Sequence, residues 1–204
     1  MTKIILTRHG HIEGITPERF RGRLDLPITA LGQRQIAATS HRINATWKIA
    51  AIYTSPMSRC VITGEAIARP SGLTVKPLAG LNDIDYGAWQ GLTHDEAKTR
   101  WPEEFRTWFH APHLAQPPGG ETLQDVLARA AATLRTVTRD HPDDAVVLVG
   151  HDSVNRVILL HVLELPLSRY WLFKQEPCTI NELDFVDGAF SVRTINETYH
   201  LSGA

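Results

Sequence analysis

The chain has 204 residues, of which 43% are hydrophobic and 21% charged, a composition typical of a globular protein. Its 21 lysines and arginines balance 22 aspartates and glutamates, so the net charge of -1 gives no polybasic signal for a nucleic-acid partner or an anionic membrane. Two cysteines cannot form a disulfide framework, and no apolar run approaches the roughly 20 residues of a membrane-spanning helix. We expect a cytoplasmic protein with a single domain, 1–204.

Strand and helix patterns alternate along the chain. Short apolar runs predict strands at 3–7, 51–54, 74–78 and 145–149, and a turn at 186–188 predicts a terminal hairpin of residues 179–185 and 189–195. Helical patterns occur at 30–45 with Thr29 as N-cap, at 56–68 with Ser55 as N-cap and Pro56 at N1, at 121–139 and at 155–163. This alternation predicts an α/β fold: a three-layer α/β/α sandwich around a mostly parallel central sheet.

The segment 90–120 interrupts the alternation. It carries aromatic residues at near-helical spacing, Trp101, Phe105, Trp108 and Phe109, followed by a proline-rich stretch. About 30 residues are too few for an independent core, so we expect a small helical insertion or cap. Its rings either anchor the insertion to the core or line the mouth of a pocket and select the group that enters it.

Polar residues follow four of the predicted strands. The first strand is followed by residues 8–11 (RHGH), the second by 55–59 (SPMSR), the third by 82–85 (NDID) and the fourth by 150–153 (GHDS). Ligands of open α/β sheets bind beyond the carboxyl ends of the strands, so we expect these four segments to meet at one edge.

The side chains of these segments suit phosphoryl chemistry. Arg8 and Arg59 offer planar forks of donors that match phosphate oxygens. A histidine of the first or fourth segment is a competent nucleophile at neutral pH. A carboxylic acid is then needed to protonate the departing oxygen, and Asp83 and Asp85 are both candidates.

Six motifs in order resemble the histidine phosphatase superfamily, also called phosphoglycerate-mutase-like, over nearly the whole chain. Residues 6–10 (LTRHG) resemble its RHG signature, and 149–151 (VGH) resemble its second histidine motif. Four further segments resemble its other motifs: 20–29 (FRGRLDLPIT), 54–60 (TSPMSRC), 81–91 (LNDIDYGAWQG) and 118–122 (PGGET). The chain resembles most the branch of α-ribazole phosphatases and broad-specificity phosphatases.

The resemblance implies a metal-independent phosphatase that acts on a small-molecule phosphomonoester and needs no cofactor. His9 would be the nucleophile that is transiently phosphorylated, and Asp83 would be the general acid and base. The same resemblance places catalytic or phosphate- and substrate-binding roles on Arg8, Arg21, Gly22, Arg59, His151 and Asp152. Seven other histidines have no motif, and surface or packing roles are expected for them.

The chain departs from the family pattern at several positions. Asp83 stands where the family normally has the longer Glu, so the neighbouring aspartate stays an alternative. Asp152 stands where glycine is common; a carboxylate repels a phosphate, so it should turn away or pair with an arginine such as Arg156. His11 and Ile15 stand where the family often has Glu and Asn, so one phosphate contact is absent or replaced, and His11 is either a pocket wall or a loop residue.

Three other functions fit parts of the pattern. A mutase of the same fold would move phosphate between hydroxyls, although mutases of this family tend to be longer. A metal hydrolase could use His9, His11 and His151 with Asp83, although the neighbouring arginines would oppose a cation. A phospho-ligand-binding module without turnover is supported only by the shortened acid. The physiological substrate and the choice between monomer and homodimer are left open.

Overall fold

The computed structural model of the chain describes residues 1–15 and 18–203. In this part, six strands form one sheet in the order β3-β2-β4-β1-β5-β6. The strands are β1 (Thr2–Arg8), β2 (Ile49–Thr54), β3 (Val75–Pro77), β4 (Ala145–Gly150), β5 (Ile180–Val186) and β6 (Ala189–Glu197). β1 to β4 run parallel, whereas β5 pairs antiparallel with β1 and with β6. The predicted mostly parallel sheet and terminal hairpin are both confirmed.

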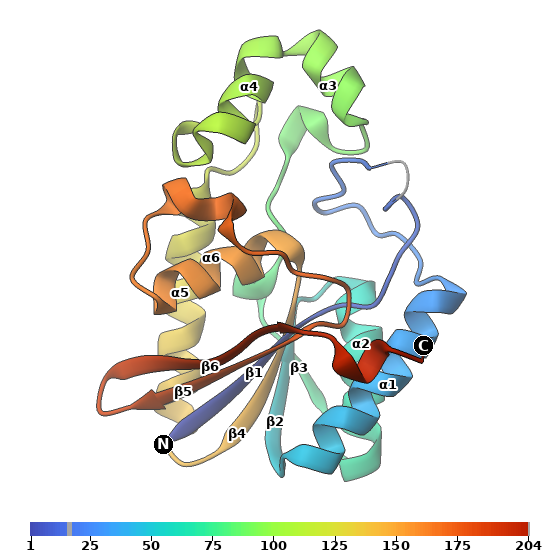
Figure 1. Cartoon of the computed structure of the whole chain (residues 1–204), viewed down its shortest axis with the longest axis vertical. Helices are drawn as coiled ribbons and strands as arrows, with labels where there is room; N and C mark the ends of the chain where they lie inside the picture. Colours follow the sequence, from blue (N-terminus) through green and yellow to red (C-terminus); the bar gives the residue numbers. More distant parts are fainter. Residues whose placement is uncertain (16–17, 204) are drawn as a thin grey trace.

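Helices cover both faces of this sheet, as the three-layer prediction requires (Figure 1). The pair α1 (Ala30–Thr46) and α2 (Ser58–Ala68) lies on one face, and the pair α5 (Leu123–Asp140) and α6 (Asp152–Val162) lies on the other. Short 3₁₀ helices are η1 (Arg69–Ser71), η2 (Ala79–Leu81), η3 (Gly87–Trp89), η5 (Leu167–Leu172) and η6 (Tyr199–Leu201). Across residues 1–15 and 18–203, no helix has both the length and the apolar character that crossing a membrane requires.

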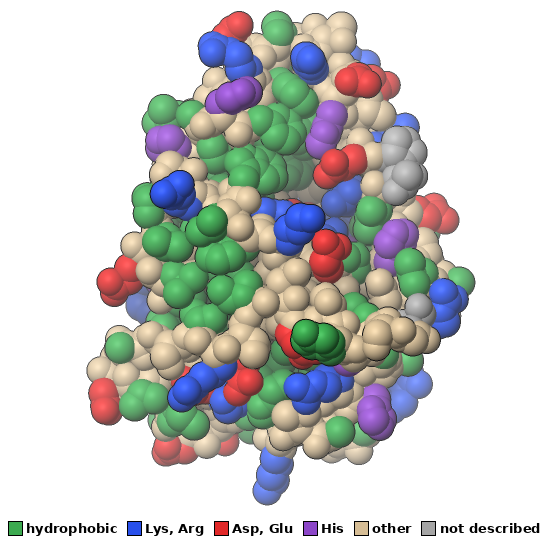
Figure 2. Space-filling model, viewed as in Figure 1, with side chains coloured by type: hydrophobic (Ala, Val, Ile, Leu, Met, Phe, Trp, Pro, Cys, Tyr) green, Lys and Arg blue, Asp and Glu red, His purple; other side chains and the backbone are tan. Residues whose placement is uncertain are grey.

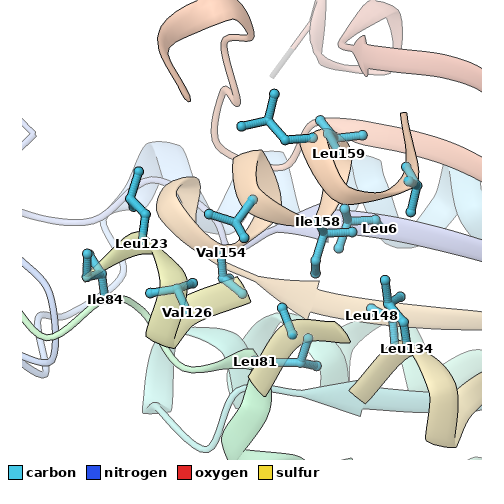
Figure 3. Packing of buried hydrophobic residues seen from close by; sticks show 14 of the residues in the cluster. Leu6, Leu81, Ile84, Leu123, Val126, Leu134, Leu148, Val154, Ile158 and Leu159 are labelled. Carbon is cyan, nitrogen blue, oxygen red and sulfur yellow. The ribbon is translucent and has the colours of Figure 1, made fainter. Parts of the chain in front are cut away.

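Two separate core clusters follow from the alternation of strand side chains. Ile4 and Leu6 of β1 are buried in the larger cluster, with α5 and α6, whereas Ile5 is buried in the smaller one, with α1 and α2. Figure 3 shows Leu6 and Leu148 of the sheet beside residues of α5 and α6, such as Ile158. Because β1 and β4 are apolar on both faces, they occupy the centre of the sheet and place their carboxyl ends side by side.

The main difference in element boundaries is at the start of α2. Thr29 caps α1 as predicted, because its side chain accepts a hydrogen bond from a backbone N–H of the first turn. The prediction that α2 begins at Pro56 with Ser55 as its cap is wrong, since the helix begins at Ser58. The Ser55 hydroxyl accepts a hydrogen bond from the Met57 N–H at 3.3 Å and donates one to Asn82 Oδ1 at 3.0 Å. The bond to Asn82 ties the end of β2 to the loop after β3, and both segments contribute to the site.

The segment 90–120 forms the expected helical insertion (Figure 1). It contains α3 (His94–Arg100), α4 (Pro102–His110) and the 3₁₀ helix η4 (Pro112–Leu114). Thr93 and Glu96 form a capping box that starts α3. Trp108 of α4 is only 1% exposed and belongs to the same core cluster as the sheet residues. The insertion is therefore anchored to the main core by its aromatic side chains.

Candidate active site

A cavity of about 290 Å³ lies beyond the carboxyl ends of the central strands. Arg8 is the last residue of β1 and His9 follows it, while His151 follows β4. The rings of His9 and His151 meet edge to face with centroids 5.1 Å apart. Figure 2 shows a hollow bordered by hydrophobic side chains on one side and by basic and acidic side chains on the other. The segments expected to meet at this edge of the sheet do so.

His9 is held as a neutral imidazole with one free nitrogen. It is 2% exposed, and its Nδ1 lies 2.8 Å from the Gly10 carbonyl oxygen. A carbonyl oxygen only accepts, so Nδ1 carries the proton and the lone pair is on Nε2. Burial, together with the positive charges of Arg59 and Arg8, lowers the pKa of His9 well below its usual value. This is the protonation state that a histidine nucleophile requires at neutral pH.

Arg8 supplies hydrogen-bond donors at the cavity wall. It lines the cavity beside His9 and is 7% exposed. Its Nη1 donates to the Gln175 carbonyl at 2.6 Å, which fixes the direction of the guanidinium. Its Nε is buried and has no hydrogen-bond partner among residues 1–15 and 18–203. A buried donor without a partner is costly.

Arg59 and His151 form a second layer directly behind the cavity. Both are 0% exposed, and neither is among the residues that line the cavity wall. Arg59 Nε donates to His151 Nδ1 at 3.1 Å, while its Nη2 donates to the Gly22 carbonyl at 2.7 Å. His151 therefore carries its proton on Nε2. Of the residues expected to bind phosphate or substrate, Arg8 and Arg21 lie at the wall, and Arg59 and His151 lie beneath them.

Of the two candidate acids, only Asp83 reaches the cavity. Its side chain lines the wall, and its Oδ2 lies 3.4 Å from Arg59 Nη2. Burial raises the pKa of Asp83, although Arg59 opposes this shift, so the carboxyl keeps its proton to higher pH than usual. Asp85 instead accepts a hydrogen bond from the Gly87 N–H at 2.8 Å and pairs with Arg23. Its place is in the loop that supports the site.

Gly22 shapes the loop that carries Arg21 to the cavity. Its φ of +47° is in the left-handed region, and a Cβ there would lie 2.8 Å from Gln90 Oε1 and 2.9 Å from the Ile84 carbonyl. Glycine is therefore required both by the backbone conformation and by the space. Its carbonyl accepts from Arg59, so the loop and the buried guanidinium fix each other.

Asp152 pairs with Arg156 as expected from the sequence. It is the first residue of α6, which begins three residues before the predicted start at 155. Arg156 Nε donates to Asp152 Oδ1 at 3.0 Å, and Arg8 Nη1 lies 4.0 Å from the same oxygen. The carboxylate lines the cavity between two guanidiniums, so its negative charge is compensated before any anion binds.

Several cavity residues were not foreseen. His94, for which only a surface or packing role was expected, lines the wall and lies 3.9 Å from Glu18. Trp171 reaches the cavity from η5, and no local motif marks it. His11 is not among the lining residues; its Nδ1 lies 3.0 Å from Thr29 Oγ1, in the loop before α1. The lining residues outside all of the quoted segments and the predicted aromatic set are Glu18, Arg19, His94 and Trp171, whereas Phe20, Tyr86 and Ser153 lie in quoted segments but were given no role.

The two neutral buried histidines predict a loss of stability in acid. The unfolded chain takes up a proton on His9 and His151 near pH 6.5, whereas burial and Arg59 hold both folded pKa values well below this. Stability should therefore fall as the pH drops below about 6.5, by up to about 1.4 kcal/mol per pH unit for each histidine. The free energy of unfolding, measured with urea between pH 8 and 5, should fall less steeply with decreasing pH in His151→Asn than in wild type.

His161 on the exposed side of α6 offers a matched control for this measurement. The variant His161→Asn should keep the wild-type dependence of the free energy of unfolding on pH, because this side chain is exposed and lies outside the cavity. An equal dependence of the free energy of unfolding on pH in wild type and His151→Asn would contradict the proposed origin of the acid sensitivity.

No group of three or more His, Cys, Asp or Glu side chains within the described ranges is arranged to hold a metal ion. The cavity combines a neutral histidine with a free nitrogen, an aspartate and guanidinium donors. This donor set matches an anionic substrate that carries its own oxygens, such as a phosphate.

Comparisons with known proteins agree with this geometry. The chain matches the histidine phosphatase superfamily (branch 1) over residues 4–198. Phosphoserine phosphatase 1 of Hydrogenobacter thermophilus is 29% identical over 201 residues, covering 98% of this chain and 95% of that protein. The structure of YhfR from Bacillus stearothermophilus has a TM-score of 0.94 and 28% identity, covering 99% of this chain and 100% of that one. A mutant phosphoserine phosphatase of Entamoeba histolytica in complex with phosphoserine has a TM-score of 0.88 and 25% identity, covering 98% and 100%.

A family match over almost the whole chain and a near-complete superposition show more than a shared fold. The motif resemblance is therefore confirmed. The chain belongs to the histidine phosphatase superfamily and is a phosphatase.

Proposed function

We propose that the chain hydrolyses small phosphomonoesters through a phosphohistidine intermediate on His9, with Asp83 as general acid and base. The observation that carries this proposal is the meeting of three groups at one cavity: a neutral imidazole with a free Nε2, a carboxyl whose pKa is raised, and a guanidinium that lines the wall beside them. Nucleophile, proton donor and anion site are the parts that phosphoryl transfer requires.

In the first step, the Nε2 lone pair of His9 attacks phosphorus as the bond between phosphorus and the leaving alcohol's oxygen breaks. Asp83 gives its proton to that oxygen, so an alcohol and not an alkoxide departs. Burial raises the pKa of Asp83, which favours the protonated form that this step needs. The product is the leaving alcohol together with phospho-His9 and an Asp83 carboxylate.

In the second step, the Asp83 carboxylate takes a proton from a water molecule whose oxygen attacks phosphorus. The phosphorus–nitrogen bond breaks, its electron pair returns to Nε2, and inorganic phosphate leaves. Asp83 is again protonated and His9 is again neutral, so the cycle closes. We assign Arg8 and Arg21 to the phosphate oxygens at the cavity wall, with Arg59 supplying positive field from behind and the neutral His151 holding the Arg59 guanidinium in place. The proposed chemistry needs no metal and no cofactor.

The proposed substrates are small metabolites. Relatives that are named phosphoserine phosphatases support this class, and a cavity of about 290 Å³ is at the small end of ligand sites. A macromolecular partner and an oligomeric state are not part of the proposal. The cytoplasmic location inferred from the sequence stays a prediction.

The direct test is to measure phosphate release from 4-nitrophenyl phosphate, phosphoserine and 3-phosphoglycerate with EDTA present. We expect inorganic phosphate from at least one ester and undiminished rates in EDTA. A mutase would share the phosphohistidine step but return the phosphate to a second hydroxyl. Rapid isomerisation of 3-phosphoglycerate with little phosphate release would contradict hydrolysis as the main reaction.

A further inference from the structure

The cavity has two chemically different parts. One part holds the groups proposed to act on the phosphate, such as His9 and Asp83. The other part contains, besides Glu18 and Arg19, a set of rings that the proposed reaction does not use: Phe20, Tyr86, His94, Trp108, Phe109 and Trp171. These rings come from the loop after β1, the loop before η3, the insertion and η5, so distant segments converge on this wall.

Two of the rings are fixed against each other at the point where the insertion meets η5. Phe109 and Trp171 are stacked, with centroids 5.3 Å apart and planes 9° from parallel. Trp171 Nε1 donates to the Trp108 carbonyl at 3.2 Å, and the Trp108 ring packs edge to face on the Tyr86 ring with centroids 5.6 Å apart. The wall is therefore preorganised, because each ring is positioned by a ring or a backbone bond of another segment.

Anchoring of the insertion accounts for only part of this cluster. Trp108 is 1% exposed, as an anchor should be, but Trp171 is 39% exposed although it lines the cavity. A large ring left partly in water at a concave site offers apolar surface to a ligand. The hydrophobic side chains gathered beside the hollow in Figure 2 show this apolar border.

We propose that the aromatic wall formed by Tyr86, Phe109 and Trp171 selects the leaving group, and that the favoured substrates are phosphomonoesters whose alcohol carries a flat apolar or aromatic group. This inference rests on the proposed function, because it concerns the same cavity. With a phosphate at His9, about 290 Å³ leaves room for a group of about one ring. Against these rings, the ammonium and carboxylate of phosphoserine would lose hydration without the gain that an apolar group has.

The test uses ester pairs whose leaving alcohols have similar intrinsic reactivity. Aryl phosphates are unsuitable because phenolates leave more easily than alkoxides, so 2-phenylethyl phosphate should be compared with ethyl phosphate. We expect kcat/KM to be at least about tenfold higher for the phenylethyl ester, since stacking and burial of one ring stabilise its complex and transition state. Phosphoserine should be turned over less efficiently than the phenylethyl ester.

Two variants on separate segments examine the wall itself. Trp171→Leu and Phe109→Leu keep apolar bulk but remove a ring, and each should lower the phenylethyl-to-ethyl ratio at least about threefold. Phe190→Leu is the matched control, because Phe190 packs on Phe185 in the β5–β6 hairpin, 4.7 Å between centroids, and is not among the cavity residues. Its ratio should equal that of wild type. Either ring variant suffices if the other does not fold.

The outcomes separate this inference from the function on which it rests. A ratio near one in wild type, or an unchanged ratio in a folded ring variant, would overturn the aromatic selection while phosphatase activity stands. If no ester of any kind releases phosphate, the proposed hydrolysis fails, and the leaving-group inference fails with it.

Discussion

The variant His9→Asn should lose phosphatase activity by at least about four orders of magnitude, because the nucleophile of the proposed first step is gone. Asparagine can keep a polar atom near the Gly10 carbonyl, to which His9 Nδ1 is bonded, but it has no basic nitrogen that can attack phosphorus. Steady-state hydrolysis of 4-nitrophenyl phosphate measures the loss, and thermal unfolding of the same sample checks that the variant is folded.

The other buried nucleophiles near the cavity are poorly suited to replace His9. His151 has its Nδ1 occupied by Arg59 and does not reach the cavity wall. The Cys60 thiol lies 3.4 Å from His151 Nε2, and burial raises its pKa far above the usual value, so it stays protonated. No neighbouring group should therefore rescue the variant.

Trapping the intermediate provides a second readout for His9. Wild-type protein quenched during turnover should carry one phosphoryl group that is labile in acid and stable in base, located on His9 by mass spectrometry of peptides. The surface variant His161→Asn should be labelled like wild type. A phosphoryl group on another residue, or activity of His9→Asn within tenfold of wild type, would contradict the assignment.

The parts of the site that sequence could predict are those fixed by strand ends. β1 and β4 are apolar on both faces, which identifies them as central parallel strands, and the residues immediately after them must lie at the same edge. Arg8, His9 and His151 were placed correctly for this reason. Each of them follows directly on a central strand, so the apolar pattern of the strand and the parallel topology suffice to predict its position.

The orientation of Arg59 could not be predicted in the same way. Its motif puts it on the first turn of α2, but a guanidinium on a long side chain can face the cavity or turn inward. Here its Nη1 and Nη2 donate to the carbonyls of Leu24 and Gly22, which belong to a loop far away in sequence. The start of α2 was also mispredicted: Ser55 Oγ accepts a hydrogen bond from the Met57 N–H, but the helix begins only at Ser58.

The aromatic wall was only half predictable. The spacing of Trp108 and Phe109 indicated a helix, and both suggested roles, anchoring and lining, apply to parts of it. The place of Trp171 depends on how η5 packs against α4. In this contact, Trp171 Nε1 donates to the carbonyl of Trp108, which is 63 positions away in the sequence. Such a contact leaves no periodic or motif signal in one sequence.

The second large effect is expected for Asp83→Asn, which should lower steady-state turnover by about 10²- to 10⁴-fold. The amide cannot give a proton to the leaving oxygen or take one from water, although it fills nearly the same space beside Arg59. The size of the loss should depend on the leaving group. Formation of phospho-His9 from an alkyl ester needs the acid, whereas 4-nitrophenolate departs without protonation.

The two steps of the proposed cycle can be separated by this dependence. With 4-nitrophenyl phosphate, Asp83→Asn should still form phospho-His9 but hydrolyse it slowly, so a burst of 4-nitrophenol approaching one equivalent per active site should precede a slow steady state. With ethyl phosphate, the first step itself should be slow and no burst should appear. Stopped-flow absorbance and rapid-quench measurements distinguish these cases.

The pH dependence of kcat/KM tests whether Asp83 acts as the acid in the first step. The first step needs the protonated carboxyl, and burial raises its pKa, so kcat/KM for alkyl esters should decline as the pH rises through that pKa. In Asp83→Asn this decline should disappear. Asp85→Asn is the matched control: its carboxylate accepts the Gly87 N–H in the supporting loop, outside the cavity, so the variant should show neither burst nor flattened profile. A burst in Asp85→Asn and none in Asp83→Asn would reverse the assignment of the acid.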